Sequence, residues 1–213
     1  MSESIKRCQK GMSLIEMVVA IAIFIFCLTG FSFFYVKIWK ANSYIYEAGQ
    51  DTYVASRSVN LTADEIKMAA QAENGDYPIK SASDFEFTVY VDDDEDGKTE
   101  KIHYFLDLDT DILKKGISEP TSDNPPSYSE EDDSVETISS HVVNEADDPV
   151  FSYFGRNFFS DDKHFDSPVS SEDIMLIKLV KVKLLVDVRP YHSPDHVAVE
   201  SFAQLRNLKD YEQ

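Results

Sequence analysis

The stretch Gly11-Met12-Ser13-Leu14-Ile15-Glu16 and the apolar run that follows it decide how this chain is organised. Residues 17–36 read MVVAIAIFIFCLTGFSFFYV, which is 20 residues without a charge. At about 1.5 Å per helical residue, this run is just long enough to cross a hydrocarbon core of about 30 Å. The sequence therefore predicts a membrane-spanning helix, with a short basic segment before it and a long acidic segment after it.

Glu16 stands just inside the start of this apolar region, between Ile15 and Met17. A lone carboxylate is costly in lipid, so a charge in such a place indicates a functional role and requires a partner. Cleavage of the chain after Gly11 would create an amine at Met12, and this amine is the nearest suitable partner.

The combination resembles the N-terminal signal of type IV pilins and type II secretion pseudopilins. The resemblance rests on Gly11, on Glu16 five positions into the mature chain, on the apolar helix and on a basic leader. The basic residues of the leader are Lys6, Arg7 and Lys10. The resemblance implies that a prepilin peptidase cuts after Gly11 and that the new N-terminus, Met12, is N-methylated. It also implies that Glu16 neutralises the amine of a neighbouring subunit when a filament assembles.

Two simpler explanations compete with the prepilin signal. An ordinary signal anchor has no need of Gly11 and would avoid Glu16. A cleaved secretory signal peptide has an apolar region of only about 7–15 residues that ends at small residues. The run found here, at 20 residues, is too long for such a region. We therefore favour the prepilin signal.

The helix is predicted to continue beyond the membrane, because the first proline is Pro78. Small and apolar side chains recur at spacings of three and four, which places them on one helix face. These residues are Ile38, Ala41, Ile45, Ala48, Thr52, Ala55, Val59, Thr62, Ile66 and Ala69. We expect the helix to reach about Ala70 and the segment 74–78 to end it. The predicted parts are a cleaved cytoplasmic leader (1–11), a transmembrane assembly helix (12–36), an amphipathic half-helix (37–72) and a β-rich extracytoplasmic domain (77–213).

The remainder of the chain predicts antiparallel strands. Alternating apolar residues indicate a hairpin over 85–91 and 102–106, a short strand at Ile112-Leu113, and a final pair over 174–188 and 197–205. Residues 118–149 are rich in Ser, Glu, Asp and Pro, so they are predicted to form a flexible acidic insertion. The predicted fold class is α+β, with the long helix packed on an antiparallel sheet as in pilins. The runs KIHYFLD, YFGRNFF and LRNLK are loosely similar to J-type minor pseudopilins.

The charge distribution restricts the partners of the chain. The net charge is −19, and loss of the leader, which has three cations and one anion, leaves −21. Such an acidic surface disfavours nucleic-acid binding, because that binding depends on Lys and Arg. Basic residues before the span orient the N-terminus to the cytoplasm and the C-terminal domain to the outside. The resemblance to pilins implies that the chain passes once through the bacterial inner membrane. The only cysteines are Cys8 and Cys27, so the C-terminal domain contains no disulfide.

One acidic loop resembles part of a calcium site. Asp92, Asp94, Asp96 and Gly97 match the first half of an EF-hand loop, D-x-D-x-D-G. The twelfth position, where an EF-hand has a bidentate Glu, is His103. Two interpretations stay open: an acidic hairpin tip that charge keeps soluble, or a weak extracytoplasmic Ca²⁺ site.

No motif indicates an enzyme. His192 and His196 are four residues apart, but Pro194 lies between them and no HExxH pattern is present, so a zinc site is not expected. We predict a minor pilin or pseudopilin that prepilin peptidase processes and that assembles with other subunits into a type II secretion or type IV pilus-like filament. The alternative is a signal-anchored extracytoplasmic binding protein or a pilus-tip adhesin, in which the acidic insertion or the loop from Asp92 to Asp96 would contact a partner or an ion such as Ca²⁺.

Overall fold

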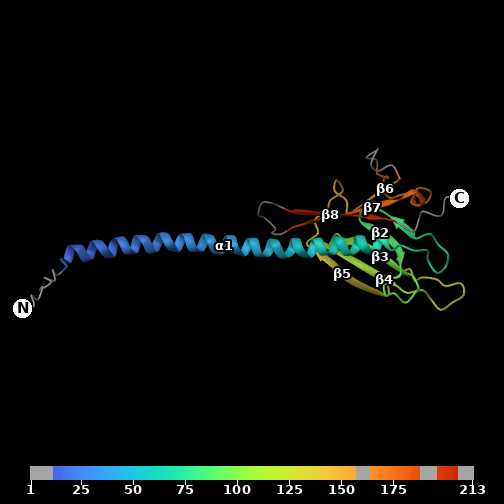
Figure 1. Ribbon diagram of the computed structural model, residues 1–213, viewed down its shortest axis with the longest axis horizontal. Coiled ribbons are helices and arrows are strands. Elements are labelled where there is room, and N and C mark those ends of the chain that lie inside the picture. The colour runs from blue at the N-terminus through green and yellow to red at the C-terminus, as the bar shows by residue number, and fades with distance from the viewer. Residues whose placement is uncertain (1–11, 157–163, 188–195, 206–213) are drawn as a thin grey trace, which may run out of the picture. The chain divides into compact units, whose positions relative to one another are not determined.

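The computed structural model describes residues 12–156, 164–187 and 196–205, apart from the side chains of residues 43–45, 47, 48, 50 and 51. The chain divides into two compact units, Met1–Glu47 and Ala48–Gln213. A single helix, α1 (Leu14–Lys67), begins in the first unit and ends in the second. All the described strands follow it in the second unit (Figure 1). The α+β class predicted from the sequence is therefore confirmed.

The N-terminal part of α1 is apolar over the length of a membrane. Residues Leu14–Asn42 form a stretch of 29 residues that is long and apolar enough to cross a bilayer. Its serine and threonine side chains bond within the helix, because Thr29 donates to the Ile25 carbonyl and Ser32 to the Leu28 carbonyl, both at 2.8 Å. Such back-bonding satisfies hydroxyl groups without water. This stretch is therefore suited to a lipid environment.

The C-terminal part of α1 buries one face against the strands of the second unit. The predicted stripe is confirmed there, since its members Ala55, Val59, Thr62, Ile66 and Ala69 are all buried. The helix ends at Lys67, three residues before the predicted end. The amide of residue 70 donates to the Tyr90 carbonyl at 2.9 Å, so the chain has already left the helix to pair with a strand.

Five strands form the first sheet, in the order β1-β2-β3-β4-β5 and antiparallel throughout. The strands are β1 (Ile79–Ala82), β2 (Glu86–Val91), β3 (Glu100–Asp107), β4 (Ile112–Ser118) and β5 (Ser134–Ser140). The predicted hairpin is confirmed as β2 and β3, in which Phe87 faces Tyr104. The predicted short strand at Ile112-Leu113 is longer than expected and includes Gly116.

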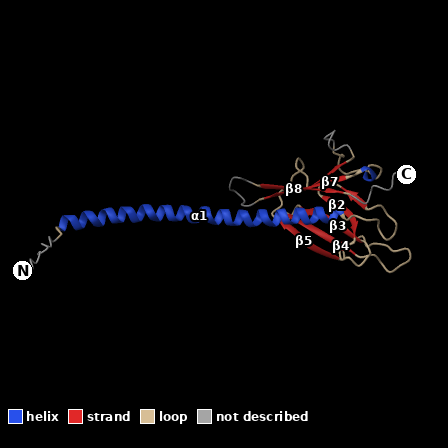
Figure 2. Cartoon of the chain, viewed as in Figure 1, coloured by secondary structure: helices blue, strands red, loops and turns tan. Residues whose placement is uncertain are grey.

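The last strands form a second sheet, in the order β6-β7-β8. These are β6 (Phe151–Phe154), β7 (Leu179–Val186) and β8 (Val197–Gln204). Figure 2 labels β7 and β8 of this sheet among the strands drawn in red. The predicted alternation is confirmed in β7, because Val180, Val182, Leu184 and Val186 are all buried. The prediction of a strand at the start of this region is wrong, since Ile174–Leu176 form a 3₁₀ turn, η1. The predicted turn at 189–195, including His192, lies outside the described residues.

Aromatic side chains join the two sheets in one core. Phe87 of β2 lies 5.6 Å, centroid to centroid, from both Phe151 and Tyr153 of β6. All three side chains are fully or almost fully buried. The Tyr153 hydroxyl donates to the Ser83 carbonyl at 2.8 Å, which satisfies the polar end of a buried ring.

The acidic insertion has more structure than we predicted. Residues 118–149 contain β5, which pairs with β4 along its length. The ring of Tyr128 packs on the ring of Tyr90 with their centroids 4.9 Å apart, and the Tyr128 hydroxyl donates to the Thr99 carbonyl at 2.7 Å. Asp132 lies 3.4 Å from the buried ammonium of Lys101 and 3.1 Å from Nδ1 of His103. Backbone pairing and a few buried polar contacts therefore order a segment with very little apolar surface.

Candidate functional site

The N-terminal site begins at the first described residue. The leader and Gly11 lie outside the described residues, whereas Met12 is described and is 69% exposed. Helix α1 starts two residues later, and its first backbone hydrogen bond runs from the Met17 amide to the Ser13 carbonyl at 3.2 Å. The peptide bond that we expect to be cut, between Gly11 and Met12, thus lies only a few residues before the start of the helix.

Ser13 and Glu16 form a reciprocal capping box at the start of α1. The Ser13 amide donates to Glu16 Oε2 at 2.9 Å, and the Ser13 hydroxyl lies 3.1 Å from the same oxygen. The Glu16 amide in turn donates to Ser13 Oγ at 3.3 Å. This arrangement satisfies backbone amides that have no partner within a helix.

The capping box gives Glu16 a partner within its own chain, whereas from the sequence we considered only the amine at Met12. Its carboxylate accepts hydrogen bonds from Ser13 of its own chain. The signal was present in the sequence, because S-x-x-E before an apolar run is the pattern of a capping box. Any partner from another subunit must therefore compete with Ser13 for the same carboxylate.

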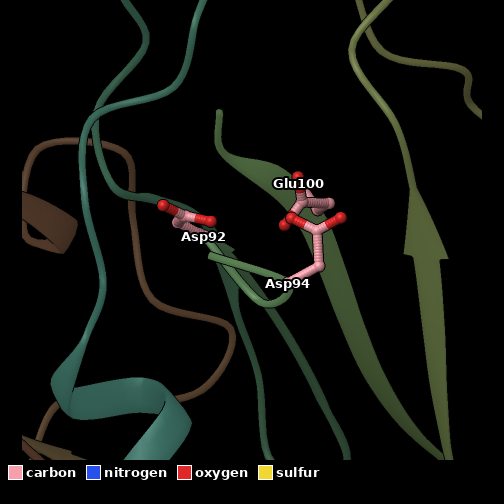
Figure 3. A group of neighbouring side chains, drawn as sticks. All are labelled: Asp92, Asp94 and Glu100. Carbon is pink, nitrogen blue, oxygen red and sulfur yellow. The ribbon is translucent and has the colours of Figure 1, made fainter. Parts of the chain in front are cut away.

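The second candidate site is the acidic loop between β2 and β3, and Figure 3 shows its carboxylates. Asp92, Asp94 and Glu100 each offer one oxygen to a group whose members all lie within 4.8 Å of one another. Asp96 is not part of this group. Its carboxylate accepts a hydrogen bond from the Lys98 amide at 2.8 Å and lies 3.5 Å from the ammonium of the same residue. The structure thus brings together two of the three predicted aspartates.

Glu100 is the member of this group that the sequence reasoning missed. It stands at the ninth position of the D-x-D-x-D-G loop, and we had looked for a carboxylate only at the twelfth. The residue is 2% exposed, and its Oε2 accepts a hydrogen bond from the Asp93 amide at 2.7 Å. Burial raises the pKa of Glu100, and the charges of Glu119 and Asp94 raise it further. A negative charge at this position is therefore costly without a cation.

Asp93 and His103 contact residues outside the group of Asp92, Asp94 and Glu100. Lys115 of β4 donates to both oxygens of Asp93 at 2.9 Å and lies 3.2 Å from Glu65 Oε2 of α1. Glu65 also accepts a hydrogen bond from the Tyr104 hydroxyl. Burial is the main reason that the pKa of Tyr104 lies well above its usual value, and the negative charge of Glu65 is the second reason. His103, the twelfth residue of the loop, contacts Asp132 instead of the acidic group.

Comparison with known families assigns the N-terminal segment. Residues 6–32 match the family model of the prokaryotic N-terminal methylation motif. No curated protein matches the chain. The match includes Gly11, Met12 and Glu16, and it overlaps the membrane-length stretch Leu14–Asn42. It ends at residue 32, so the J-type subtype stays a prediction. Residues 6–32 thus carry a prokaryotic N-terminal methylation motif that overlaps an apolar helix of membrane length, which supports the predicted resemblance to type IV pilins and pseudopilins.

Proposed function

We propose that this protein is a minor pilin or pseudopilin that prepilin peptidase cuts after Gly11, leaving an N-methylated Met12. The mature subunit then assembles with other subunits, through α1, into a type II secretion or type IV pilus-like filament. One observation carries this proposal: the methylation motif at 6–32 is in register with the helix start at Leu14 and the membrane-length stretch Leu14–Asn42. The β-rich unit that follows lies outside the membrane, with the N-terminus in the cytoplasm.

The capping box suggests how Glu16 acts in assembly. In a separate subunit the carboxylate is held by Ser13 through two contacts of 2.9 and 3.1 Å. The N-terminal amine of an adjacent subunit is a cation, so its contact with the carboxylate adds an attraction between opposite charges that the neutral donors of Ser13 do not provide. Exchange of the internal contacts for this amine therefore favours neighbouring subunits at one axial offset. Charge pairing of this kind sets register more than it adds stability.

The first test concerns processing. The full chain is expressed in cells with and without a prepilin peptidase, and the N-terminal sequence and intact mass of the purified protein are measured. We expect a chain that begins at methylated Met12 only when the peptidase is present. A chain that still begins at Met1 beside an active peptidase would contradict the proposal, and it would favour a signal-anchored binding protein.

The second test separates capping from pairing between subunits. Glu16→Ala removes the carboxylate, and we expect normal processing with loss of the subunit from purified filaments. Ser13→Ala is the matched control, because it removes the capping hydroxyl and keeps the carboxylate for a neighbouring amine. We expect Ser13→Ala to enter filaments. Equal loss of both variants would show that the capping box, and not pairing between subunits, explains the glutamate.

A further inference from the structure

We infer that Asp92, Asp94 and Glu100 form a binding site for Ca²⁺ where β2 ends and β3 begins. The site is independent of the filament function proposed above, because it lies in the β-rich unit and uses no residue of the N-terminal motif. It also differs from the EF-hand pattern in the sequence, since Glu100 replaces Asp96 in the set of ligands.

The geometry suits one calcium ion. Ca²⁺ binds oxygen atoms at about 2.3–2.6 Å, so two ligands on opposite sides of the ion are about 5 Å apart. The three carboxylate oxygens all lie within 4.8 Å of one another. Figure 3 shows that they come from the end of β2, the loop and the start of β3. Mg²⁺ fits less well, because it requires near-ideal octahedral geometry at about 2.0–2.1 Å.

Two buried oxygen atoms lack any hydrogen-bond donor. Within the described residues, neither Oε1 of Glu100 nor Oδ1 of Asp92 receives a hydrogen bond, although both atoms are buried. Glu100 itself is 2% exposed. A buried carboxylate oxygen without a partner costs free energy, and native structures contain few such groups. A bound cation would satisfy both atoms at once.

The nearby cations of the described part of the chain have other partners. Lys98 lies beside Asp96, and Lys115 binds Asp93 and Glu65. Lys115 binds both oxygens of Asp93, and Asp93 is not a member of the group that Asp92, Asp94 and Glu100 form. Three carboxylates that form no ion pair with a described Lys or Arg favour a divalent cation over a protein side chain.

The loop backbone holds the aspartates in place without using every oxygen. The Gly97 amide donates to Asp92 Oδ2 at 3.2 Å, and Gly97 has a positive φ of 88° that favours glycine. The Asp96 amide donates to Asp94 Oδ1 at 3.0 Å. Each aspartate therefore keeps one oxygen for the ion. With only three carboxylates from the chain, we expect a dissociation constant of about 10⁻⁴–10⁻³ M, as in extracellular calcium modules.

The binding test uses the full chain, purified in detergent micelles and stripped of metal with a chelator. Isothermal titration with CaCl₂ should give one site per chain, and MgCl₂ should give at least about tenfold weaker binding. Asp94→Asn and Glu100→Gln should each weaken Ca²⁺ binding at least about tenfold. Glu95→Gln is the matched control, because Glu95 is exposed in the same loop, is no member of the group and carries the same charge.

Thermal unfolding distinguishes a ligand from a structural residue at Glu100. In chelator, Glu100→Gln should melt at the same temperature as the wild type or higher, because it removes a buried charge. In millimolar CaCl₂ the order should reverse, since only the wild type gains stability from the bound ion. Absence of Ca²⁺ binding to the wild type, equal binding by Asp94→Asn, or an equal loss in Glu95→Gln would each overturn the site. The site would also be overturned if the difference in melting temperature between Glu100→Gln and the wild type were the same in chelator and in CaCl₂.

Discussion

Gly116 offers a sharp test of how the acidic insertion is held on the first sheet. The residue lies in β4, opposite His103 of β3 and Val135 of β5. Its φ is not positive, so alanine could adopt the same backbone conformation. A Cβ atom at this position would, however, lie 1.9 Å from Oδ2 and 2.3 Å from Cγ of Asp132. Gly116→Ala must therefore displace the Asp132 carboxylate.

The cost of that displacement follows from the contacts of Asp132. The carboxylate lies 3.4 Å from the Lys101 ammonium and 3.1 Å from the His103 ring, and the side chains of Lys101 and Asp132 are only 4% and 10% exposed. Breaking a buried ion pair costs about 3–5 kcal/mol. Lys101 keeps its 2.6 Å hydrogen bond to the Ser129 carbonyl, which reduces the loss. We expect Gly116→Ala to lower the free energy of unfolding by about 2–3 kcal/mol.

The assay is urea unfolding of the full chain in detergent micelles, followed by the near-ultraviolet circular dichroism of the tyrosines. Gly155→Ala is the control, because its Cβ would meet the nearest atom, of Phe165, at an ordinary 3.5 Å. We expect the control to change stability by less than about 0.5 kcal/mol. The argument is refuted if Gly116→Ala is as stable as the control, since Asp132 would then be free to move at little cost.

Two further predictions concern single polar contacts. The Lys114 ammonium donates to Asp107 at 2.6 Å and, with other hydrogen bonds, lowers the pKa of Asp107 from 3.8 to about 2. A carboxylate with a lowered pKa stabilises the fold above its unfolded-state value, so this contribution should disappear as the pH falls from about 4 to 2. Urea unfolding at a series of pH values should show that the free energy of unfolding falls more for the wild type than for Asp107→Asn over this range. If the two free energies changed in parallel with pH, Asp107 would not be the source of the effect. Tyr153→Phe leaves the Ser83 carbonyl without its donor at 2.8 Å and should cost about 1–2 kcal/mol in the same unfolding assay, whereas an unchanged midpoint would show that the bond contributes nothing.

The parts of the fold that the sequence predicted are those with a strong periodic signal. The helix stripe through Ala55, Val59 and Ile66 and the alternation of β7 both follow from burial on one face. β5 was missed because it is an edge strand whose first four residues are exposed, so its sequence shows no alternation. Its position comes from the backbone ladder with β4, which no pattern within residues 134–140 reveals.

The turn at Ile174–Leu176 was misread for a local reason. The Ser170 hydroxyl donates to Asp173 at 2.7 Å and accepts a hydrogen bond from the Asp173 amide at 3.2 Å. The Ile174 amide donates to the Ser170 carbonyl at 2.9 Å, so the chain turns before the alternating residues can extend. Side-chain to backbone bonds of Ser and Asp compete with strand pairing in this way.

The two candidate sites were predictable to different degrees. Glu16 and its register could be read directly, because the apolar run fixes where the charge stands. Glu100 could not be assigned from spacing alone, since the ninth position of a calcium loop often acts through water. Its role depends on burial and on the side chain's return toward Asp92 and Asp94, which only the folded β2–β3 connection provides.

The capping box also bears on how a subunit could leave the membrane. The uncharged run of residues 17–36 matches the thickness of the hydrocarbon core, with Glu16 at one boundary and Lys37 at the other. Withdrawal of the helix toward its C-terminal side must carry Glu16 across the full core, and an acidic side chain at the bilayer centre costs about 2.5–3.5 kcal/mol. Hydrogen bonds from Ser13 travel with the carboxylate and lower that barrier. The two residues that begin the helix therefore determine the polar contribution to the energy of extraction, in addition to the larger cost of exposing the apolar run to water.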